Sequence, residues 1–389
     1  MNILLIPATD WLRHPVISRQ HHIFERIAKK NKVHVLQFDL YPENSERETN
    51  LIIHRLRKVP VKGLATYYIL NMGPYSKEIM SIVSENKIDV IVVTNLLPGI
   101  PAFLGKNFGC KIVFDLKDMF SDNSAIYYRN VLLRSIIKGI SEWLLQRLLK
   151  RADHVIAVSM FLLEYAEEIG VKNISLITNG VELGIFKPNL PQNKLCQIKE
   201  NIHGEKVIGF VGTIDRWLDF ETVFLAFKEL LTKINDLKLL IVGGKMVSSY
   251  FDEVQSHARR IGVIDKVIFT GIVPHAKVPY YVNVMDVCLI PMKSELRLNQ
   301  ARCPDKLFEY LACGKPVVST PISEVVRIGQ GAVRFYNDVP GLVTAIMDIL
   351  SDESLRVRME KKALLIAKDY SWQVIADIYK NVLGNVAND

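Results

Sequence analysis

Short apolar runs rich in β-branched residues recur along the chain, separated by segments with helical periodicity. This alternation is typical of parallel strands joined by helical crossovers. The runs lie at 2–7, 33–38, 89–94, 111–115 and 154–158 in the first half, and at 206–211, 237–242, 266–270, 287–291 and 316–320 in the second. Most are continuously apolar, as expected for strands covered on both faces. We therefore predict an α/β chain with two doubly wound sheets.

The segment at 179–188, NGVELGIFKP, contains the Asn-Gly pair, a further glycine and a proline that mark a turn-rich crossing. We expect one domain at 1–186 and a second at 187–369. Residues 370–389 follow as an amphipathic helix that could pack on either domain. Ligands of open α/β sheets bind beyond the carboxyl ends of the strands, so we expect the two sheets to face each other across a cleft that holds the site.

The composition places the chain among ordinary globular proteins. Of 389 residues, 49% are hydrophobic and 23% charged, which is enough apolar material for two cores and excludes a disordered chain. The five cysteines have no CxxC spacing, which favours a reducing compartment. The apolar run at the start is too short for a signal-peptide core, so we expect a cytoplasmic location.

The positive charge is concentrated in two stretches. Residues 1–62 contain 11 Lys and Arg against six Asp and Glu, and residues 129–151 contain six against one. The net charge of the whole chain is +8. Such patches suit nucleic acid, an anionic membrane or an acidic substrate.

Glycines follow two strands of the second half. Gly212 and Thr213 come after one strand, and Gly243 with Gly244 after the next. Glycine at such a position lets backbone N–H groups approach a phosphate, although it also occurs in plain tight turns. Neither GxGxxG nor GxxxxGK[ST] occurs there, which argues against a dinucleotide-dependent dehydrogenase and a P-loop phosphotransferase.

A second group of candidates lies in PDKLFEYLACGKPVVST at 304–320. Pro304 and Asp305 suit a helix start, and the glycine and proline at the end suit a helix stop before a buried strand. Lys306 in the first turn could neutralise a diphosphate, and Glu309 could bind both hydroxyls of a ribose. The alternative is a surface Lys–Glu pair with no ligand.

The first half contains two further groups of candidates. Asp115 and Asp118 follow a strand and could position an acceptor hydroxyl or act as its base, or else cap a helix. Arg19 and His22 share one face of a helix start near Trp11 and could bind an anionic acceptor. We expect His21 on the solvated surface. No spacing suits a metal site.

Residues 129–152 combine apolar residues at helical spacing with Arg and Lys. This pattern suits an interfacial helix on an anionic membrane, and it equally suits a crossover helix that covers its own sheet. We expect the sheet to cover most of its apolar residues, and a membrane role for its exposed end and for the loop at 119–130.

Several motifs in a fixed order resemble those of retaining glycosyltransferases of family 4. They are ADHVIAVSMFL, ISLITNGVELGIF, IGFVGTIDRWLDFE, VIFTGIVPHAKVPYYVNVMDVCLIPM, PDKLFEYLACGKPVVST and SWQVIADIYKNVL, and together they cover nearly the whole chain. The resemblance implies the GT-B fold, with two Rossmann-like domains, and a final helix that returns to the first domain.

The resemblance also implies an activity: transfer of a sugar from a nucleotide-diphosphate sugar, with retained anomeric configuration, no cofactor and no required metal. Glu309 matches the family's ribose-binding glutamate, and Gly212 matches the glycine beside the diphosphate. We assign Thr213 and Gly243 to the donor-binding residues as well. The loop Gly271, Ile272 and Val273 matches the one whose backbone contacts the base.

Three departures from the family pattern bear on the site. Ala301 stands where the family carries a first glutamate, eight residues before Glu309. Thr213 and Asp219 replace positions that are often basic, so we assign Arg216 and Lys306 to neutralise the diphosphate. FDLKDMFSD, which contains Asp115 and Asp118, resembles a YDxxDD segment of one subgroup.

The leading hypothesis is a glycosyltransferase that extends a glycan or lipid-linked acceptor at the cytoplasmic face of a membrane. A GT-B-like epimerase or sugar phosphorylase would share the ribose-binding glutamate. A non-catalytic membrane- or nucleic-acid-binding protein draws support from the basic stretches. These stretches lack interleaved aromatic residues, so we expect no nucleic-acid partner.

Overall fold

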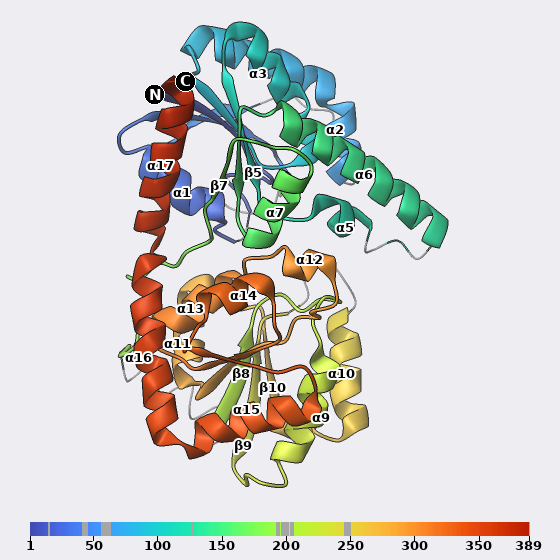
Figure 1. Cartoon of the computed structure of the whole chain (residues 1–389), viewed down its shortest axis with the longest axis vertical. Helices are drawn as coiled ribbons and strands as arrows, with labels where there is room; N and C mark the ends of the chain where they lie inside the picture. The colour runs from blue at the N-terminus through green and yellow to red at the C-terminus, as the bar shows by residue number, and fades with distance from the viewer. Residues whose placement is uncertain are drawn as a thin grey trace. The chain divides into compact units, whose positions relative to one another are not determined.

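The computed structural model describes residues 1–14, 16–40, 46–55, 64–125, 128, 130–191, 195, 202, 206–244 and 250–388 (Figure 1). The chain divides into two compact units. The first comprises Met1–Thr178 and Trp372–Asp389, and the second comprises Asn179–Ser371.

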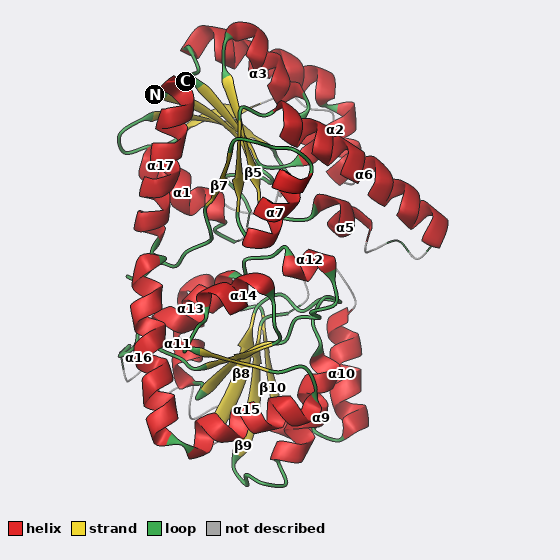
Figure 2. Ribbon diagram, viewed as in Figure 1, coloured by secondary structure: helices red, strands yellow, loops and turns green. Residues whose placement is uncertain are grey.

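The first unit is built on a seven-stranded parallel sheet with the order β3-β2-β1-β4-β5-β6-β7. Its strands are β1 (Asn2–Ile6), β2 (Lys32–Gln37), β3 (Ile52–Arg55), β4 (Val90–Val93), β5 (Lys111–Leu116), β6 (His154–Ala157) and β7 (Ile174–Leu176). Its helices are α1 (Arg19–Ile27), α2 (Leu64–Leu70), α3 (Met72–Asn86), α4 (Leu96–Gly99), α5 (Phe120–Ala125), α6 (Val131–Arg151), α7 (Met160–Glu168) and α17 (Trp372–Asn388), with a 3-10 helix η1 (Pro101–Phe108). Helices cover both faces of the sheet (Figure 2).

The second unit repeats this architecture with six parallel strands in the order β10-β9-β8-β11-β12-β13. Its strands are β8 (Lys206–Val211), β9 (Leu237–Val242), β10 (Val267–Gly271), β11 (Val287–Ile290), β12 (Val317–Ser319) and β13 (Val333–Phe335). Its helices are α9 (Phe220–Leu230), α10 (Tyr250–Ile261), α11 (Val278–Val284), α12 (Arg297–Gln300), α13 (Asp305–Ala312), α14 (Ser323–Ile328), α15 (Val339–Ser351) and α16 (Glu353–Asp369), with 3-10 helices η2 (Ile264–Lys266) and η3 (His275–Lys277). The predicted pair of doubly wound sheets is therefore confirmed.

In both units the chain winds outward in two directions from a central strand. The switch lies between β1 and β4 in the first unit and between β8 and β11 in the second. These central strands are buried almost throughout, which is why their sequences are continuously apolar. The carboxyl ends of the strands at such a switch are where ligands of this architecture bind.

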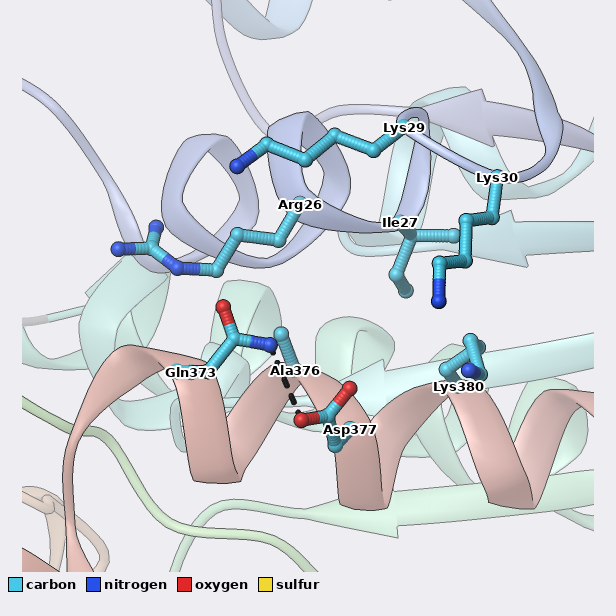
Figure 3. A pocket seen from close by; sticks show the side chains of 8 residues that line it. All are labelled: Arg26, Ile27, Lys29, Lys30, Gln373, Ala376, Asp377 and Lys380. Carbon is cyan, nitrogen blue, oxygen red and sulfur yellow. Dashed lines mark hydrogen bonds between the residues drawn. The ribbon is translucent and has the colours of Figure 1, made fainter.

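Helix α17 lies beside α1 in the first unit (Figure 1). The rings of His22 and Trp372 stack with centroids 4.8 Å apart, and Phe24 meets Tyr379 edge to face at 5.5 Å. A shallow pocket of about 110 Å³ marks the seam between the two helices (Figure 3). Its lining is Arg26, Ile27, Lys29, Lys30, Gln373, Ala376, Asp377 and Lys380.

The crossing between the units lies at Thr178 and Asn179, earlier than the boundary expected near residue 187. Asn179 Nδ2 donates to the Cys303 carbonyl, and Val181 forms a parallel bridge with Ser371. Phe186 is fully buried. These contacts attach the turn-rich segment to the second unit.

Helix α6 departs from the expectation that most of its apolar residues cover the sheet. Only Leu145, Leu148 and Leu149 are buried. Its N-terminal half leaves the body of the unit (Figure 1), and Leu132, Ile136 and Ile140 are exposed there. Part of the preceding loop, residues 126, 127 and 129, lies outside the described residues.

Two further observations concern the whole described chain. None of its helices is both long enough and apolar enough to cross a membrane. Cys110, Cys288, Cys303 and Cys313 are buried and form no disulfide, and Cys196 lies outside the described residues.

Candidate active site

Three neighbouring strands of the second unit end on glycines that lie against one another. Gly212 N–H donates to the Val242 carbonyl at 2.9 Å, and Gly243 N–H donates to the Gly271 carbonyl at 3.0 Å. All three glycines have positive φ, at +139°, +131° and +68° for Gly212, Gly243 and Gly271. A Cβ on Gly243 would lie 2.0 Å from the Gly212 carbonyl oxygen, so this approach requires glycine.

Helix α13 is fixed to the end of β8. Tyr310 is fully buried, and its hydroxyl accepts a hydrogen bond of 2.7 Å from the Val211 N–H. Burial raises the pKa of Tyr310, which keeps its hydroxyl neutral. This bond joins the last residue of β8 to the helix that carries the Lys306 and Glu309 side chains.

The Lys306 ammonium lies beside the first of the strand-end glycines. Its Nζ is 4.2 Å from the centroid of the Phe210 ring, and a methyl group added to Gly212 would lie 3.0 Å from that Nζ. Burial, followed by the positive charge of Arg302, lowers the pKa of Lys306 to about 8. A lysine with this pKa is still mainly protonated at pH 7, so it places a positive charge at the ends of the strands.

Glu309 lies one turn further along α13, and His275 holds its carboxylate. His275 Nε2 and Glu309 Oε1 are 3.1 Å apart, and the hydrogen bond to Glu309 raises the pKa of His275. His275 was not among the candidates that the sequence motifs suggested. It is 34 residues from Glu309 in the sequence, and its place in the same segment as the Gly271 loop was the only available signal.

The Gly271 loop presents an apolar side chain to solvent. Ile272 is 70% exposed, and a Cβ added to Gly244 would lie 3.3 Å from its Cγ1. Val273 is half-buried next to it. An exposed Ile beside two glycines offers apolar contact area that a planar ring can cover.

Arg216 contacts α10 in the structure. Its guanidinium pairs with Glu253 Oε1 at 2.6 Å and lies over the Tyr250 ring at 5.7 Å. Arg302 is the cation whose charge acts on Lys306, and it stacks over Trp217 at 4.2 Å. Arg302 was not among the sequence candidates because the matched motif begins at Pro304. Thr213 is half-buried beside Gly212.

Two positions that depart from the family pattern have structural roles. Ala301, which stands where the family carries its first glutamate, is fully buried immediately after α12 and packs there as a small apolar side chain. Asp219 is the N-cap of α9, where its carboxylate accepts the Thr222 N–H at 3.1 Å.

Asp115 and Arg19, which the sequence suggested as a catalytic and an acceptor-binding residue, pair with each other inside the first unit. Asp115 has no exposed surface, and its Oδ2 is 3.4 Å from Arg19 Nε and from Gln20 Nε2. Arg19 also donates to the carbonyls of Ile177 and Thr178. This geometry favours a structural role, which links α1, β5 and the segment that follows β7.

Trp11 and His21 are also interior residues, so the expectation that His21 is solvated was wrong. Their rings stack at 4.0 Å, and His21 Nε2 lies 2.8 Å from the Trp11 carbonyl oxygen. Burial lowers the pKa of His21 to about 4, so this ring stays neutral. His22 stacks on Trp372 as described above, which favours a packing role for it too.

Asp118 differs from these interior residues. It is half-exposed two residues beyond the end of β5, and no described residue forms a hydrogen bond or ion pair with its side chain. It therefore remains the accessible carboxylate of the two that the sequence singled out. Within the described residues, no three His, Cys, Asp or Glu side chains cluster as metal ligands would.

Comparison with protein-family models gives the same assignment for both units. The model described as Glycosyltransferase Family 4 matches residues 21–184, and the model described as Glycosyl transferases group 1 matches residues 205–352. The chain is a family 4 glycosyltransferase. The resemblance seen in the sequence motifs is thereby confirmed at the level of the family.

Two relatives of this glycosyltransferase match along most of their length. The lipopolysaccharide 1,2-N-acetylglucosaminetransferase of Salmonella typhimurium is 24% identical over 386 residues, which is 94% of this chain and 92% of that protein. TuaH of Bacillus subtilis, whose name assigns it provisionally to teichuronic acid biosynthesis, is 24% identical over 86% of this chain and 84% of its own.

Solved structures confirm the GT-B fold of the glycosyltransferase. Sucrose-phosphate synthase from Thermosynechococcus elongatus has a TM-score of 0.76 with 18% identity, and the alignment covers 99% of each chain. HepE of Anabaena, solved in complex with UDP-glucose, has a TM-score of 0.73 with 15% identity, over 99% of this chain and 100% of its own.

Proposed function

We propose that this glycosyltransferase transfers a sugar, with retention of anomeric configuration, from a nucleotide-diphosphate sugar to a glycan or lipid-linked acceptor of a cell-surface polysaccharide or glycoconjugate. The observation that carries the proposal is the Lys306 ammonium, which lies beside Gly212 where β8 ends. Family membership and the names of the relatives support the class of reaction and product.

In the proposed donor complex, the diphosphate lies at the ends of β8 and β9. The backbone of Gly212 and Thr213 and the Lys306 ammonium provide hydrogen bonds and positive charge there. Glu309 accepts the ribose hydroxyls, and the base lies along the loop of Gly271, Ile272 and Val273. A UDP-sugar is a reasonable first donor to test, because HepE was solved with UDP-glucose.

The proposed reaction breaks the bond between the anomeric carbon and the diphosphate oxygen. The acceptor hydroxyl attacks the same face of the sugar and gives its proton to the departing phosphate oxygen. Negative charge grows on the diphosphate as the bond breaks, and Lys306 stabilises that charge. We assign Asp118 to orient the acceptor hydroxyl and propose that Lys306 makes a metal ion unnecessary.

The first experiment measures the binding of UDP-, GDP-, ADP- and dTDP-sugars by calorimetry. Lys306→Ala and Glu309→Ala should each weaken binding of one nucleotide class about tenfold or more, since each removes a charge-assisted contact, and tenfold corresponds to about 1.4 kcal/mol. The matched control is Lys233→Ala with Glu229→Ala, which removes an exposed Lys–Glu pair at 2.7 Å elsewhere in the unit. Equal binding by all variants would refute the assignment of the site.

The second experiment follows the reaction itself. With the nucleotide sugar that binds, the wild type should release the nucleoside diphosphate and add sugar to lipid-linked or glycan acceptors, with or without EDTA. Nuclear magnetic resonance of the product should show the anomeric configuration of the donor. An epimerised donor with no transfer would favour the epimerase alternative, and an inverted product would refute retention.

A further inference from the structure

The outward face of α6 carries a stripe of apolar side chains that the described residues of its own unit leave largely exposed. The stripe runs through Leu132, Ile136, Ile140 and Trp143, with spacings of four, four and three residues. These spacings place the four side chains within one narrow arc of the helix. Their exposed fractions range from 49% to 72%, and a Cβ added to Gly139 would meet no atom within 4 Å.

The opposite face of α6 is the one that packs on the unit. Leu145, Leu148 and Leu149 are buried there. Lys138 pairs with Asp122 of α5 at 2.6 Å, and Glu142 accepts a hydrogen bond of 2.7 Å from the Tyr165 hydroxyl. Glu142 is the only acidic residue of α6, and its carboxylate is therefore hydrogen-bonded on the inner face of the helix. The apolar outward stripe is therefore additional to the apolar face that the fold requires.

Toward the C-terminal end of α6, basic side chains follow the apolar ones on the same outward face. Arg147 and Lys150 follow Trp143 at spacings of four and three residues, and both are exposed. The Arg147 guanidinium lies over the Trp143 ring at 5.6 Å, where the apolar part of the stripe meets the basic part. No acidic residue of α6 shares this face. By the rise of an α-helix, the apolar part is about 17 Å long.

An exposed apolar stripe that ends in a tryptophan and then in basic side chains is complementary to the surface of an anionic bilayer. Leucine and isoleucine side chains enter the boundary of the acyl chains, tryptophan favours the headgroup level, and Arg and Lys attract lipid phosphates. We propose that the outward face of α6 docks this enzyme on an anionic phospholipid bilayer, with Leu132, Ile136, Ile140 and Trp143 inserted and Arg147 and Lys150 at the headgroups. This inference rests on the proposed function insofar as docking brings the enzyme to a lipid-linked acceptor.

Sedimentation of the full chain with vesicles tests the inference. Vesicles of phosphatidylcholine with 30 mol% phosphatidylglycerol should bind the wild type, and binding should weaken when salt is raised because the basic part is screened. Leu132→Gln/Ile136→Gln/Ile140→Gln should reduce the partition coefficient about tenfold or more. Arg147→Gln/Lys150→Gln should remove most of the preference for anionic over pure phosphatidylcholine vesicles.

The matched control is Ile69→Gln/Leu70→Gln on α2, which changes two exposed apolar residues of the same unit outside α6. It should leave vesicle binding unchanged. Trp143 is the most exposed tryptophan of the chain, so brominated lipids should quench its emission, and Trp143→Phe should abolish that quenching. If the triple Gln variant still binds vesicles and brominated lipids still quench its Trp143 emission, the assignment of this face is wrong.

Two further outcomes separate this inference from the proposed function and from another occupant of the stripe. If the triple Gln variant loses vesicle binding but binds nucleotide sugar as the wild type does, docking and donor binding are independent, as we expect. If the wild type binds vesicles but no nucleotide, the proposed function fails and the docking face stands. If the wild type is a dimer by light scattering, the triple Gln variant a monomer, and neither sediments with vesicles, a second copy covers α6 and the inference is wrong.

Discussion

At the scale of single residues, Lys306 connects the electrostatics of the site to a measurable pH dependence. Its pKa of about 8 means that the free enzyme loses this charge as the pH rises above 8. The ratio kcat/KM reports groups of the free enzyme. We expect kcat/KM to be flat near pH 7 and to fall about tenfold per pH unit above pH 8. Because an arginine stays charged, Lys306→Arg should abolish this limb even if its rate is lower, and a limb that persists would assign the titration to another group.

His275 gives a prediction about stability. Its pKa in the folded protein is raised by Glu309 above the ordinary value of about 6.5, so folding favours the protonated ring. The stabilisation is complete below pH 6.5 and is lost as the pH rises through the folded pKa. Denaturant unfolding should therefore show a larger destabilisation by His275→Ala at pH 5.5 than at pH 9. A difference that does not vary with pH would mean that the pair with Glu309 does not form.

The two aspartates after β5 should behave oppositely when each is changed to alanine. Asp115→Ala leaves the buried Arg19 guanidinium without its carboxylate, which costs about 3–5 kcal/mol and should lower Tm by many degrees in the absence of substrate. Asp118→Ala removes a half-exposed carboxylate and should leave Tm nearly unchanged while it lowers transfer to the acceptor. Calorimetry and a transfer assay on the same preparations measure both effects.

At the scale of elements, the close packing of the strand-end glycines leads to a prediction about stability. Gly243→Ala forces a Cβ to within 2.0 Å of the Gly212 carbonyl oxygen at a positive φ, so the ends of β8 and β9 must separate. We expect a loss of several kcal/mol and of nucleotide binding. Gly262→Ala is the control, since its φ is also positive, at +84°, but its Cβ would meet nothing within 4 Å. Gly262→Ala should lower the free energy of unfolding by only about 1 kcal/mol. Equal losses of stability in the two variants would show that the positive φ alone, and not the contact with Gly212, causes the destabilisation.

The sequence predicted the central strands and missed three of the four edge strands. β1, β4, β8 and β11 are buried on both faces, so hydrophobicity alone marks them. The missed strands β3, β7 and β13 are short and half-exposed, and their apolar runs are too brief to stand out.

For the candidate site, as for the strands, the sequence predicted local features and missed contacts between distant residues. Lys306 and Glu309 could be recognised as neighbours from the sequence because they lie one helix turn apart. Arg19 and Asp115, in contrast, are 96 residues apart in the sequence. No local pattern could disclose that pair. The sequence therefore supplied the candidates, and the tertiary structure separated the interior residues from the accessible ones.

At the scale of the whole molecule, the two units differ in how their sequences are arranged. The second unit is one continuous segment, whereas the first needs α17 from beyond it. Residues 179–371 expressed alone should fold and bind the nucleotide donor, because sheet, Lys306 and Glu309 all lie within them. Residues 1–178 alone should unfold at a lower temperature than the first unit of the full chain, since they lack Trp372 and Tyr379. Circular dichroism and calorimetry check both, and a stable 1–178 fragment would contradict the role given to α17.

The place of α17 also sets an order of events during synthesis. As the ribosome proceeds, β1 to β7 emerge first, but the partners of His22 and Phe24 emerge only after the entire second unit. The second unit can therefore fold before the first unit is complete, while the surface of α1 that packs on α17 is still uncovered. A chain that contains α1 but ends before Trp372 leaves His22 and Phe24 without their aromatic partners on α17, and such incomplete packing is what chaperones and proteases act on.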